Sequence, residues 1–343
     1  MIVLGIESSC DETACALVNE KKEILSSVVW SQYEEHRRFG GVVPEIAARA
    51  HLEQINLLLK KTMTDACVSF KDLSAVAVAA GPGLIGGVLV GTMTAKAIAL
   101  AHHLPFIAIN HLEGHALMAR LSNPVEFPYL LLLASGGHCQ ILAVEAPGKY
   151  IRLGGTMDDS AGEAFDKVAK MLSVGYPGGP HVEKAAQQGN PKAFQLPLPM
   201  KGRDGCDFSF SGLKTAVRQK IDQKGPFSEQ EKADMCASFQ LAVIKIMVDR
   251  MKHGIAAFKA HYPNASHLVV SGGVAANKAL RAALEELANK EKMTFFAPPI
   301  SLCTDNGVMI AWAGLERFRL GHQDSLDFRP RPRWPLDTLK KTP

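Results

Sequence analysis

The feature that most constrains the fold is a strand–turn–strand unit that occurs twice in the chain. The first unit covers residues 2–18, with a polar turn at 7–12, and the second covers residues 129–144, with a Ser-Gly-Gly-His turn at 135–138. Short apolar segments on both sides of a small polar turn predict β-hairpins. Because the same layout recurs, we interpret the chain as an internal duplication.

A second pair of units combines a strand, a glycine-containing turn and a helix. One spans residues 75–102 and turns at 81–83, and the other spans residues 267–290 and turns at 271–273. Glycines at such turns let backbone N–H groups approach a phosphate, and the helix that follows adds its positive end. The four units predict a duplicated α/β fold with a nucleotide in a cleft between two lobes. A last helix is expected at 308–320.

Composition excludes several classes of protein. With 47% apolar and 21% charged residues, the 343-residue chain is typical of a globular protein, and its length favours two domains. Its longest apolar runs are far shorter than the roughly 20 residues that cross a bilayer, and its start lacks a signal-peptide pattern. Seven scattered cysteines indicate reduced thiols. We expect a cytoplasmic protein with no membrane association, whose net charge of +4 permits an RNA partner.

Two histidines indicate a metal site. His111 and His115 are four residues apart, which on a helix places both on one face with their nitrogens able to converge on one ion. A surface or core pair is the alternative reading of this spacing. A zinc protease is disfavoured, because its motif needs Glu directly after the first His, where this chain has Leu112 and only then Glu113.

Ten short motifs follow one another along the chain, at residues 5–13, 40–45, 81–83, 111–115, 135–138, 161–167, 176–180, 208–214, 271–274 and 303–307. Together they resemble the bacterial TsaD family, the tRNA threonylcarbamoyladenosine transferases. The resemblance implies the duplicated two-lobed fold of actin, Hsp70 and the sugar kinases (ASKHA), with a central nucleotide cleft. Lobe I would comprise residues 1–110 and about 304–330, lobe II residues 111–303, and residues 331–343 would form a C-terminal tail.

The resemblance also implies a reaction. The threonylcarbamoyl group of threonylcarbamoyl-AMP would be transferred to N6 of adenosine 37, just 3′ of the anticodon, in tRNAs that read codons beginning with A, which forms t6A. Two helper proteins would act with the enzyme, a paralogous ASKHA-fold subunit (TsaB-like) and a small ATPase (TsaE-like). A small-molecule kinase of the same fold is the alternative function, followed by a metalloprotease.

Residue roles follow from the family motifs. The resemblance assigns His111, His115 and Asp305 as ligands of one divalent metal. Fe²⁺ is the ion usually assigned, although two imidazoles and one carboxylate also suit Zn²⁺. The residues expected to bind the donor, together with Asp305, are Ala134, Ser135, Gly136, Gly137, His138, Asp166, Gly179 and Asn277.

Adenine N6 is a poor nucleophile, so the reaction needs a group that accepts its proton. Asp11 and Glu12, in the turn of the first hairpin, are the candidate bases, and turn capping is the alternative role for both. His138 is expected to bind the donor phosphate, with a place near the metal as the other possibility.

Two surfaces are expected to meet partners. The proline-rich basic tail at 329–333 is read as an irregular extension whose arginines would contact RNA phosphates. The small-residue helix at 86–99 could pack against the paralogue. In that case a bulky substitution at Gly91 or Ala95 should weaken the pairing, and otherwise it should only disturb the core.

Overall fold

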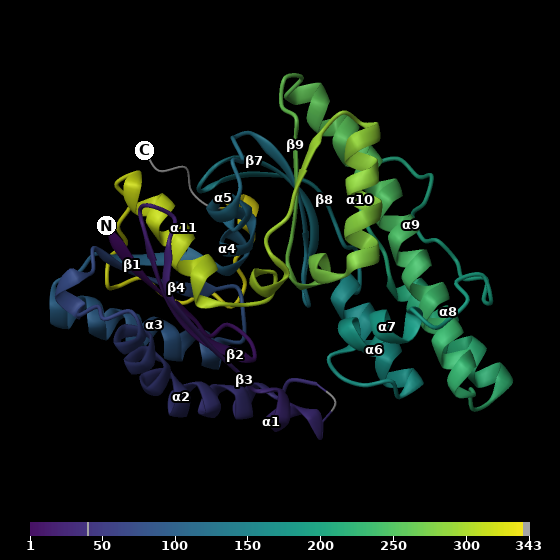
Figure 1. Ribbon diagram of the computed structural model, residues 1–343, viewed down its shortest axis with the longest axis horizontal. Coiled ribbons are helices and arrows are strands. Elements are labelled where there is room, and N and C mark those ends of the chain that lie inside the picture. Colours follow the sequence, from purple (N-terminus) through teal and green to yellow (C-terminus); the bar gives the residue numbers. More distant parts are fainter. Residues whose placement is uncertain (40, 339–343) are drawn as a thin grey trace. The chain divides into compact units, whose positions relative to one another are not determined.

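The computed structural model describes residues 1–39 and 41–338, which form two compact units (Figure 1). Unit 1 comprises residues 1–124, 146–150 and the described chain from residue 304 onward, and the rest of residues 125–303 forms unit 2. Unit 1 therefore continues beyond residue 110, where we expected lobe I to stop, and it includes the described part of the tail. Gly40, which begins one motif, and residues 339–343 lie outside the described residues.

The sheet of unit 1 has the strand order β3-β2-β1-β4-β5. Central strand β1 pairs antiparallel with β2 and parallel with β4. Strands β4 and β5 are buried along their whole length, as expected of parallel strands that are covered on both faces. The strands are β1 (Ile2–Glu7), β2 (Glu12–Asn19), β3 (Ile24–Ser31), β4 (Ala75–Gly81) and β5 (Phe106–Asn110).

The sheet of unit 2 has the order β8-β7-β6-β9-β10 and repeats this arrangement. Its central strand β6 pairs antiparallel with β7 and parallel with β9, just as β1 pairs with β2 and β4. The strands are β6 (Tyr129–Ala134), β7 (Cys139–Ala146), β8 (Lys149–Gly155), β9 (His267–Ser271) and β10 (Thr294–Phe296). The matching order and directions confirm the predicted duplication and both predicted hairpins.

Helices cover both faces of the unit 1 sheet. Gly5 of β1 faces α11, where an added Cβ would collide with the backbone of Ala311, whereas its neighbour Leu4 packs in the cluster that contains Ile55 of α2 and Ile98 of α3. Successive strand residues point to opposite faces, so α11 lies on one face and α2 and α3 lie on the other. The helices are α1 (Tyr33–Arg37), α2 (Pro44–Asp65), η1 (Phe70–Asp72), α3 (Ile85–His102), α4 (His111–Leu117), α5 (Ala119–Ser122), α11 (Gly307–Arg319) and η4 (Leu336–Thr338).

Helix α3 turns its small residues inward. Gly91 and Ala95 are buried, and a Cβ on Gly91 would press against Ser8 and Val78. The prediction that Gly91 and Ala95 contact a paralogue is therefore wrong, because both residues pack in the core of unit 1. Among the described helices, only α3 is long and apolar enough to cross a bilayer. Core helices of globular proteins meet the same criteria of length and composition.

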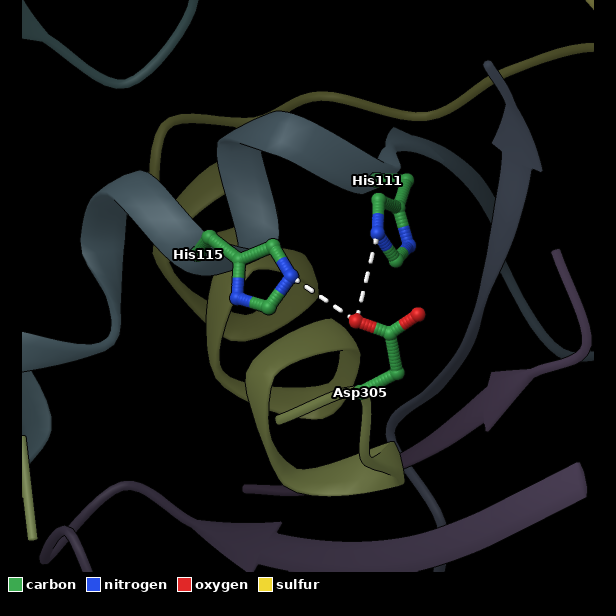
Figure 2. A group of neighbouring side chains, drawn as sticks. All are labelled: His111, His115 and Asp305. Carbon is green, nitrogen blue, oxygen red and sulfur yellow. Dashed lines mark hydrogen bonds and ion pairs between the residues drawn. The ribbon is translucent and has the colours of Figure 1, made fainter. Parts of the chain in front are cut away.

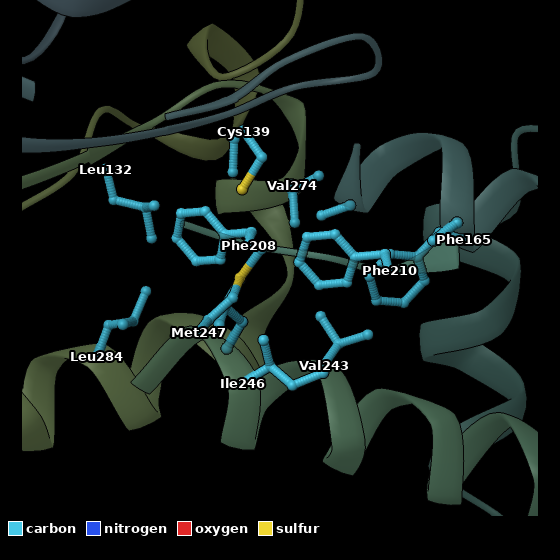
Figure 3. Packing of buried hydrophobic residues seen from close by; sticks show 14 of the residues in the cluster. Leu132, Cys139, Phe165, Phe208, Phe210, Val243, Ile246, Met247, Val274 and Leu284 are labelled. Carbon is cyan, nitrogen blue, oxygen red and sulfur yellow. The ribbon is translucent and has the colours of Figure 1, made fainter. Parts of the chain in front are cut away.

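The core of unit 2 gathers around two phenylalanines from the irregular segment before α8. Phe208 and Phe210 are fully buried and stack with their ring centroids 6.0 Å apart (Figure 3). The helix expected at 274–290 is divided, because Asn277 ends η2 and its side chain accepts the backbone N–H of Leu280 to start α10. The helices are α6 (Ala161–Leu172), α7 (Gly178–Ala186), α8 (Ser211–Lys224), α9 (Glu229–His261), η2 (Gly273–Ala276), α10 (Lys278–Lys290) and η3 (Ile300–Leu302).

Candidate functional site

The two histidines stand at the start of a helix that the sequence itself fixes. Strand β5 ends at Asn110, whose side-chain oxygen accepts the backbone N–H of Leu112 and so caps α4. The helix then begins at His111, and the spacing of four residues brings His115 beside it, with the ring centroids 4.9 Å apart. A capped helix of only seven residues therefore presents both imidazoles together.

Asp305 completes the group from a distant part of the chain. It lies two residues before α11, which Asn306 caps by accepting the N–H of Met309. Oδ1 of Asp305 lies 3.0 Å from Nε2 of His115 and 3.5 Å from Nε2 of His111 (Figure 2).

The three side chains thus offer one nitrogen or oxygen each within 4.8 Å of one another. The two imidazoles are buried, and the carboxylate is partly exposed. This donor set is compatible with a divalent metal ion.

A buried carboxylate lies behind the first imidazole. Oε2 of Glu7 is 2.8 Å from Nδ1 of His111, and the hydroxyl of Ser9 is 3.0 Å from the same nitrogen. The other oxygen of Glu7 accepts the backbone N–H of Ser9, so the carboxylate is fixed on both sides. A proton on Nδ1 would make a hydrogen bond to Glu7, which fixes the ring with Nε2 facing Asp305. Sequence reasoning missed Glu7, although it ends the first strand inside a motif.

The carboxylates on either side of His111 affect its protonation. Burial lowers its pKa, but Asp305 and Glu7 raise it more, and the net result is a pKa of about 9. Without a metal ion the two carboxylates therefore favour the protonated, positively charged imidazole, and an ion bound by Nε2 would take the place of that proton.

The structure places Glu12 within electrostatic reach of Asp305 and places Asp11 beside Glu12. Glu12 begins β2, and burial followed by the charges of Asp11 and Asp305 raises its pKa well above the ordinary value. Burial and the same two carboxylates also raise the pKa of the Cys10 thiol. The turn before β2 therefore adds acidic groups to the His111, His115 and Asp305 cluster.

Glu113 has a different role from the histidines on its helix. Its fully buried carboxylate accepts hydrogen bonds from Arg317 of α11, the backbone N–H of Gly148 and the Tyr150 hydroxyl. A carboxylate held by three donors serves to fix α4 on α11, and it argues against the glutamate base of a zinc protease. The pairing with Arg317 joins residues 204 positions apart, so no local pattern could have predicted it.

The residues expected to bind the donor gather at the carboxyl ends of two neighbouring strands of unit 2. Strand β6 ends at Ala134, and the backbone N–H of Ser135 closes the turn by donating to the His138 carbonyl. Gly136 and Gly137 have open space where a Cβ would stand, so their backbone is accessible. The turn after β9 packs directly against this one, because a Cβ on Gly272 would collide with the Ala134 carbonyl.

Of the other three residues of this set, Gly179 and Asn277 lie at helix starts and Asp166 lies in the middle of α6. Asp166 of α6 accepts the backbone N–H of Gly178 at 2.6 Å, which holds the start of α7, and Gly179 beside it has open space around its Cα. Asn277 caps α10 and donates its amide to Gln240. Asp166 and Gly179 are therefore brought together, whereas the amide of Asn277 is engaged in fixing its own helix.

Comparison with known proteins identifies the family. The model of the family TsaD, described as tRNA N6-adenosine threonylcarbamoyltransferase, matches residues 23–312. The chain belongs to the TsaD family. A protein of that description from Paramagnetospirillum magneticum is 62% identical over 98% of this chain and 97% of its own length. Another from Rhodospirillum rubrum is 59% identical over 98% of this chain and 94% of its own length.

Solved structures share the fold of this TsaD chain at low sequence identity. HypF from T. kodakarensis matches with a TM-score of 0.60 and 13% identity, over 93% of this chain and 48% of that protein. Component A of the (R)-2-hydroxyglutaryl-CoA dehydratase from Acidaminococcus fermentans matches with a TM-score of 0.54 and 16% identity, over 92% and 98% of the two chains. These likenesses support the ASKHA fold that the motifs implied.

Proposed function

We propose that this TsaD protein transfers the threonylcarbamoyl group of threonylcarbamoyl-AMP to N6 of adenosine 37 in tRNAs that read codons beginning with A, which forms t6A. Its family membership over most of its length is the observation that supports this function. In this reaction the bond between N6 and the carbamoyl carbon forms, the bond from that carbon to the phosphate oxygen breaks, and AMP leaves. The small-molecule kinase is the other function that the fold alone would allow.

We further propose that His111, His115 and Asp305 bind one divalent ion, Fe²⁺ by family resemblance, with Zn²⁺ as the alternative. Such an ion would supply positive charge that stabilises developing negative charge on donor oxygens. Within the protein, Glu7 would fix the ring of His111 by accepting a hydrogen bond from its Nδ1–H. The cap at Asn110 and the pairing of Glu113 with Arg317 hold the helix that carries both imidazoles.

The donor would bind on unit 2 at the turn from Ala134 to His138, together with Asp166, Gly179 and Asn277. The accessible backbone at Gly136 and Gly137 supports this assignment, because amides at a glycine turn suit a phosphate. Asn277 would contribute mainly by holding the start of α10, since its side chain is engaged there.

Asp11 or Glu12 would accept the proton that leaves N6. Glu12 is supported by its place at the start of β2, within electrostatic reach of the proposed ligand Asp305. Asp11 stays a candidate because its side chain is hydrogen-bonded to that of Glu12.

The substrate tRNA would be accompanied by two protein partners, a TsaB-like paralogue and a TsaE-like ATPase, in the cytoplasm. An apolar stripe on α3 supports a protein partner: Ile85, Leu89 and Met93 follow at four-residue spacing and are 48%, 42% and 57% exposed. We assign this stripe, in place of Gly91 and Ala95, to the paralogue. Met93→Lys should then weaken pairing with that subunit.

The function is tested by single-turnover transfer from labelled threonylcarbamoyl-AMP to unmodified tRNA, with the His111→Ala/His115→Ala variant beside the wild type and the partner proteins present. Label in the RNA that depends on the two histidines is the expected result. Donor that is bound but never transferred to any tRNA would refute the function.

The role of Glu7 needs a separate measurement, by titration of the chelator-treated protein with Fe²⁺ or Co²⁺. Glu7→Gln should weaken binding of the ion about 10- to 100-fold. Unchanged affinity would contradict its positioning role.

A further inference from the structure

The chain after α11 is held against the carboxyl end of β4. We call residues Phe328–Trp334 the arginine–proline segment. The backbone N–H of Arg331 donates to the Ala80 carbonyl at 2.8 Å, and the Pro332 carbonyl accepts the N–H of Gly83 at 3.2 Å. The segment forms neither helix nor strand, as its composition predicted, but these bonds fix its course.

The far end of the segment lies next to the first metal ligand. The Trp334 carbonyl accepts a hydrogen bond of 2.8 Å from the side-chain amide of Asn110. Asn110 caps α4 and directly precedes His111. The arginine–proline segment is therefore positioned beside the candidate active site, within the same unit.

Arg329, Arg331 and Arg333 are exposed and stand at every second position of this segment. The Arg331 guanidinium lies 5.0 Å from the ring centroids of both Phe328 and Trp334, which restrains it while its edge remains exposed. Within the described residues, the side chains of Arg329 and Arg333 make no hydrogen bond or ion pair. The segment thus presents three positive charges within five residues.

The site beside the segment is acidic. Asp305 is one of the proposed ligands, Glu7 contacts His111, and the charges of Asp11 and Asp305 both act on Glu12. The two positive charges of the proposed metal would not balance these four carboxylates if all of them were ionised. A polyanion that approaches this surface would be repelled unless positive groups stood nearby. Adenosine 37 has to reach the same surface while attached to phosphates on both sides.

We propose that the arginine–proline segment binds phosphates of the tRNA anticodon loop next to adenosine 37. This inference rests on the proposed function, since it assigns a surface to its RNA substrate. Arg331 offers a restrained guanidinium, and Arg329 and Arg333 extend the contact to neighbouring phosphates. Arginine suits this role because its planar fork binds two phosphate oxygens at once.

The test is binding of an unmodified tRNA that reads a codon beginning with A, measured between about 50 and 200 mM salt, the range in which phosphate contacts dominate affinity. The variant is Arg329→Gln/Arg333→Gln, which leaves the anchoring contacts of Arg331 intact. The control is Lys60→Gln/Lys71→Gln, which removes the same charge from unit 1. Lys71 precedes the start of β4, at the opposite end of the strand from the segment.

The arginine variant should bind the tRNA about tenfold more weakly at the low-salt end, and its slope of log affinity against log salt should fall by about 1.5. The control should keep the wild-type slope. Binding of threonylcarbamoyl-AMP and of Co²⁺ should be unchanged in both.

If the arginine variant and the wild type had equal slopes of log tRNA affinity against log salt, the proposal would be overturned. A loss of affinity for a protein partner would not rescue it. Arg331→Lys provides a second measure, because it keeps the charge and removes the planar fork, and weaker tRNA binding is expected. The proposed function fails on a different result, the absence of label transfer by the wild type.

Discussion

Replacing Glu113 with Gln should destabilise unit 1 strongly, because it leaves a buried guanidinium without its counter-charge. The carboxylate is fully buried and lies 2.8 Å from Nε of Arg317, 2.7 Å from the N–H of Gly148 and 2.9 Å from the Tyr150 hydroxyl. Gln keeps the size of the side chain and one acceptor oxygen but removes the charge. Breaking a buried ion pair in this way costs about 3–5 kcal/mol.

Tryptophan fluorescence can follow this unit by itself. The three tryptophans of the chain, Trp30, Trp312 and Trp334, all lie in unit 1. Urea unfolding followed by their emission should show a loss of about 3–5 kcal/mol in the free energy of unfolding. At about 2–4 °C per kcal/mol for a unit of this size, the melting temperature should fall by about 6–20 °C.

Glu45→Gln is the matched control, because its partner Arg49 lies at 2.8 Å in an ion pair whose side chains are 77% and 76% exposed. An exposed pair of this kind contributes at most about 0.5 kcal/mol. The double variant Glu113→Leu/Arg317→Met removes both charges and should recover part of the stability, because the Gly148 N–H and the Tyr150 hydroxyl lose their acceptor. If Glu113→Gln were as stable as the control, the buried pair would not hold α4 on α11 in the way we infer.

Three further predictions address the core, the acidic turn and the thiols. Gly91→Leu should cost about 1–3 kcal/mol by overpacking, while the exposed Met93→Leu should be neutral; equal stabilities would place Gly91 outside the core. Burial raises the pKa of Glu12 above its ordinary 4.5, so its folded form retains the proton and the free energy of unfolding falls as the pH rises through that raised pKa. Glu12→Gln should therefore gain stability over the metal-free wild type with rising pH, and a constant difference between 4.5 and neutral pH would contradict the shift. Alkylation should modify exposed Cys67 long before Cys15, whose pKa burial raises to about 12, and comparable rates in a mass-spectrometric time course would disprove that burial.

The elements of this fold could be read from local sequence because their signals are local. Short apolar runs around the turns at 7–12 and 135–138 predicted both hairpins, and a glycine turn predicted where α3 begins. The helix expected at 274–290 was divided for an equally local reason, the capping side chain of Asn277, which the periodicity did not reveal. The inward face of α3 was misjudged, because small residues suit a helix interface and a tight core equally well.

The sequence by itself determined the duplicated α/β fold, the family and the pair of imidazoles, since each depends on residues close together in the chain or on motifs in order. Only the tertiary structure decided that Asp305 lies 3.0 Å from His115, that Glu7 lies behind His111, and that the arginine–proline segment lies beside Asn110. These contacts join residues from 104 to 224 positions apart. Their partners are chosen by how strands and helices pack, and no spacing along the chain encodes that choice.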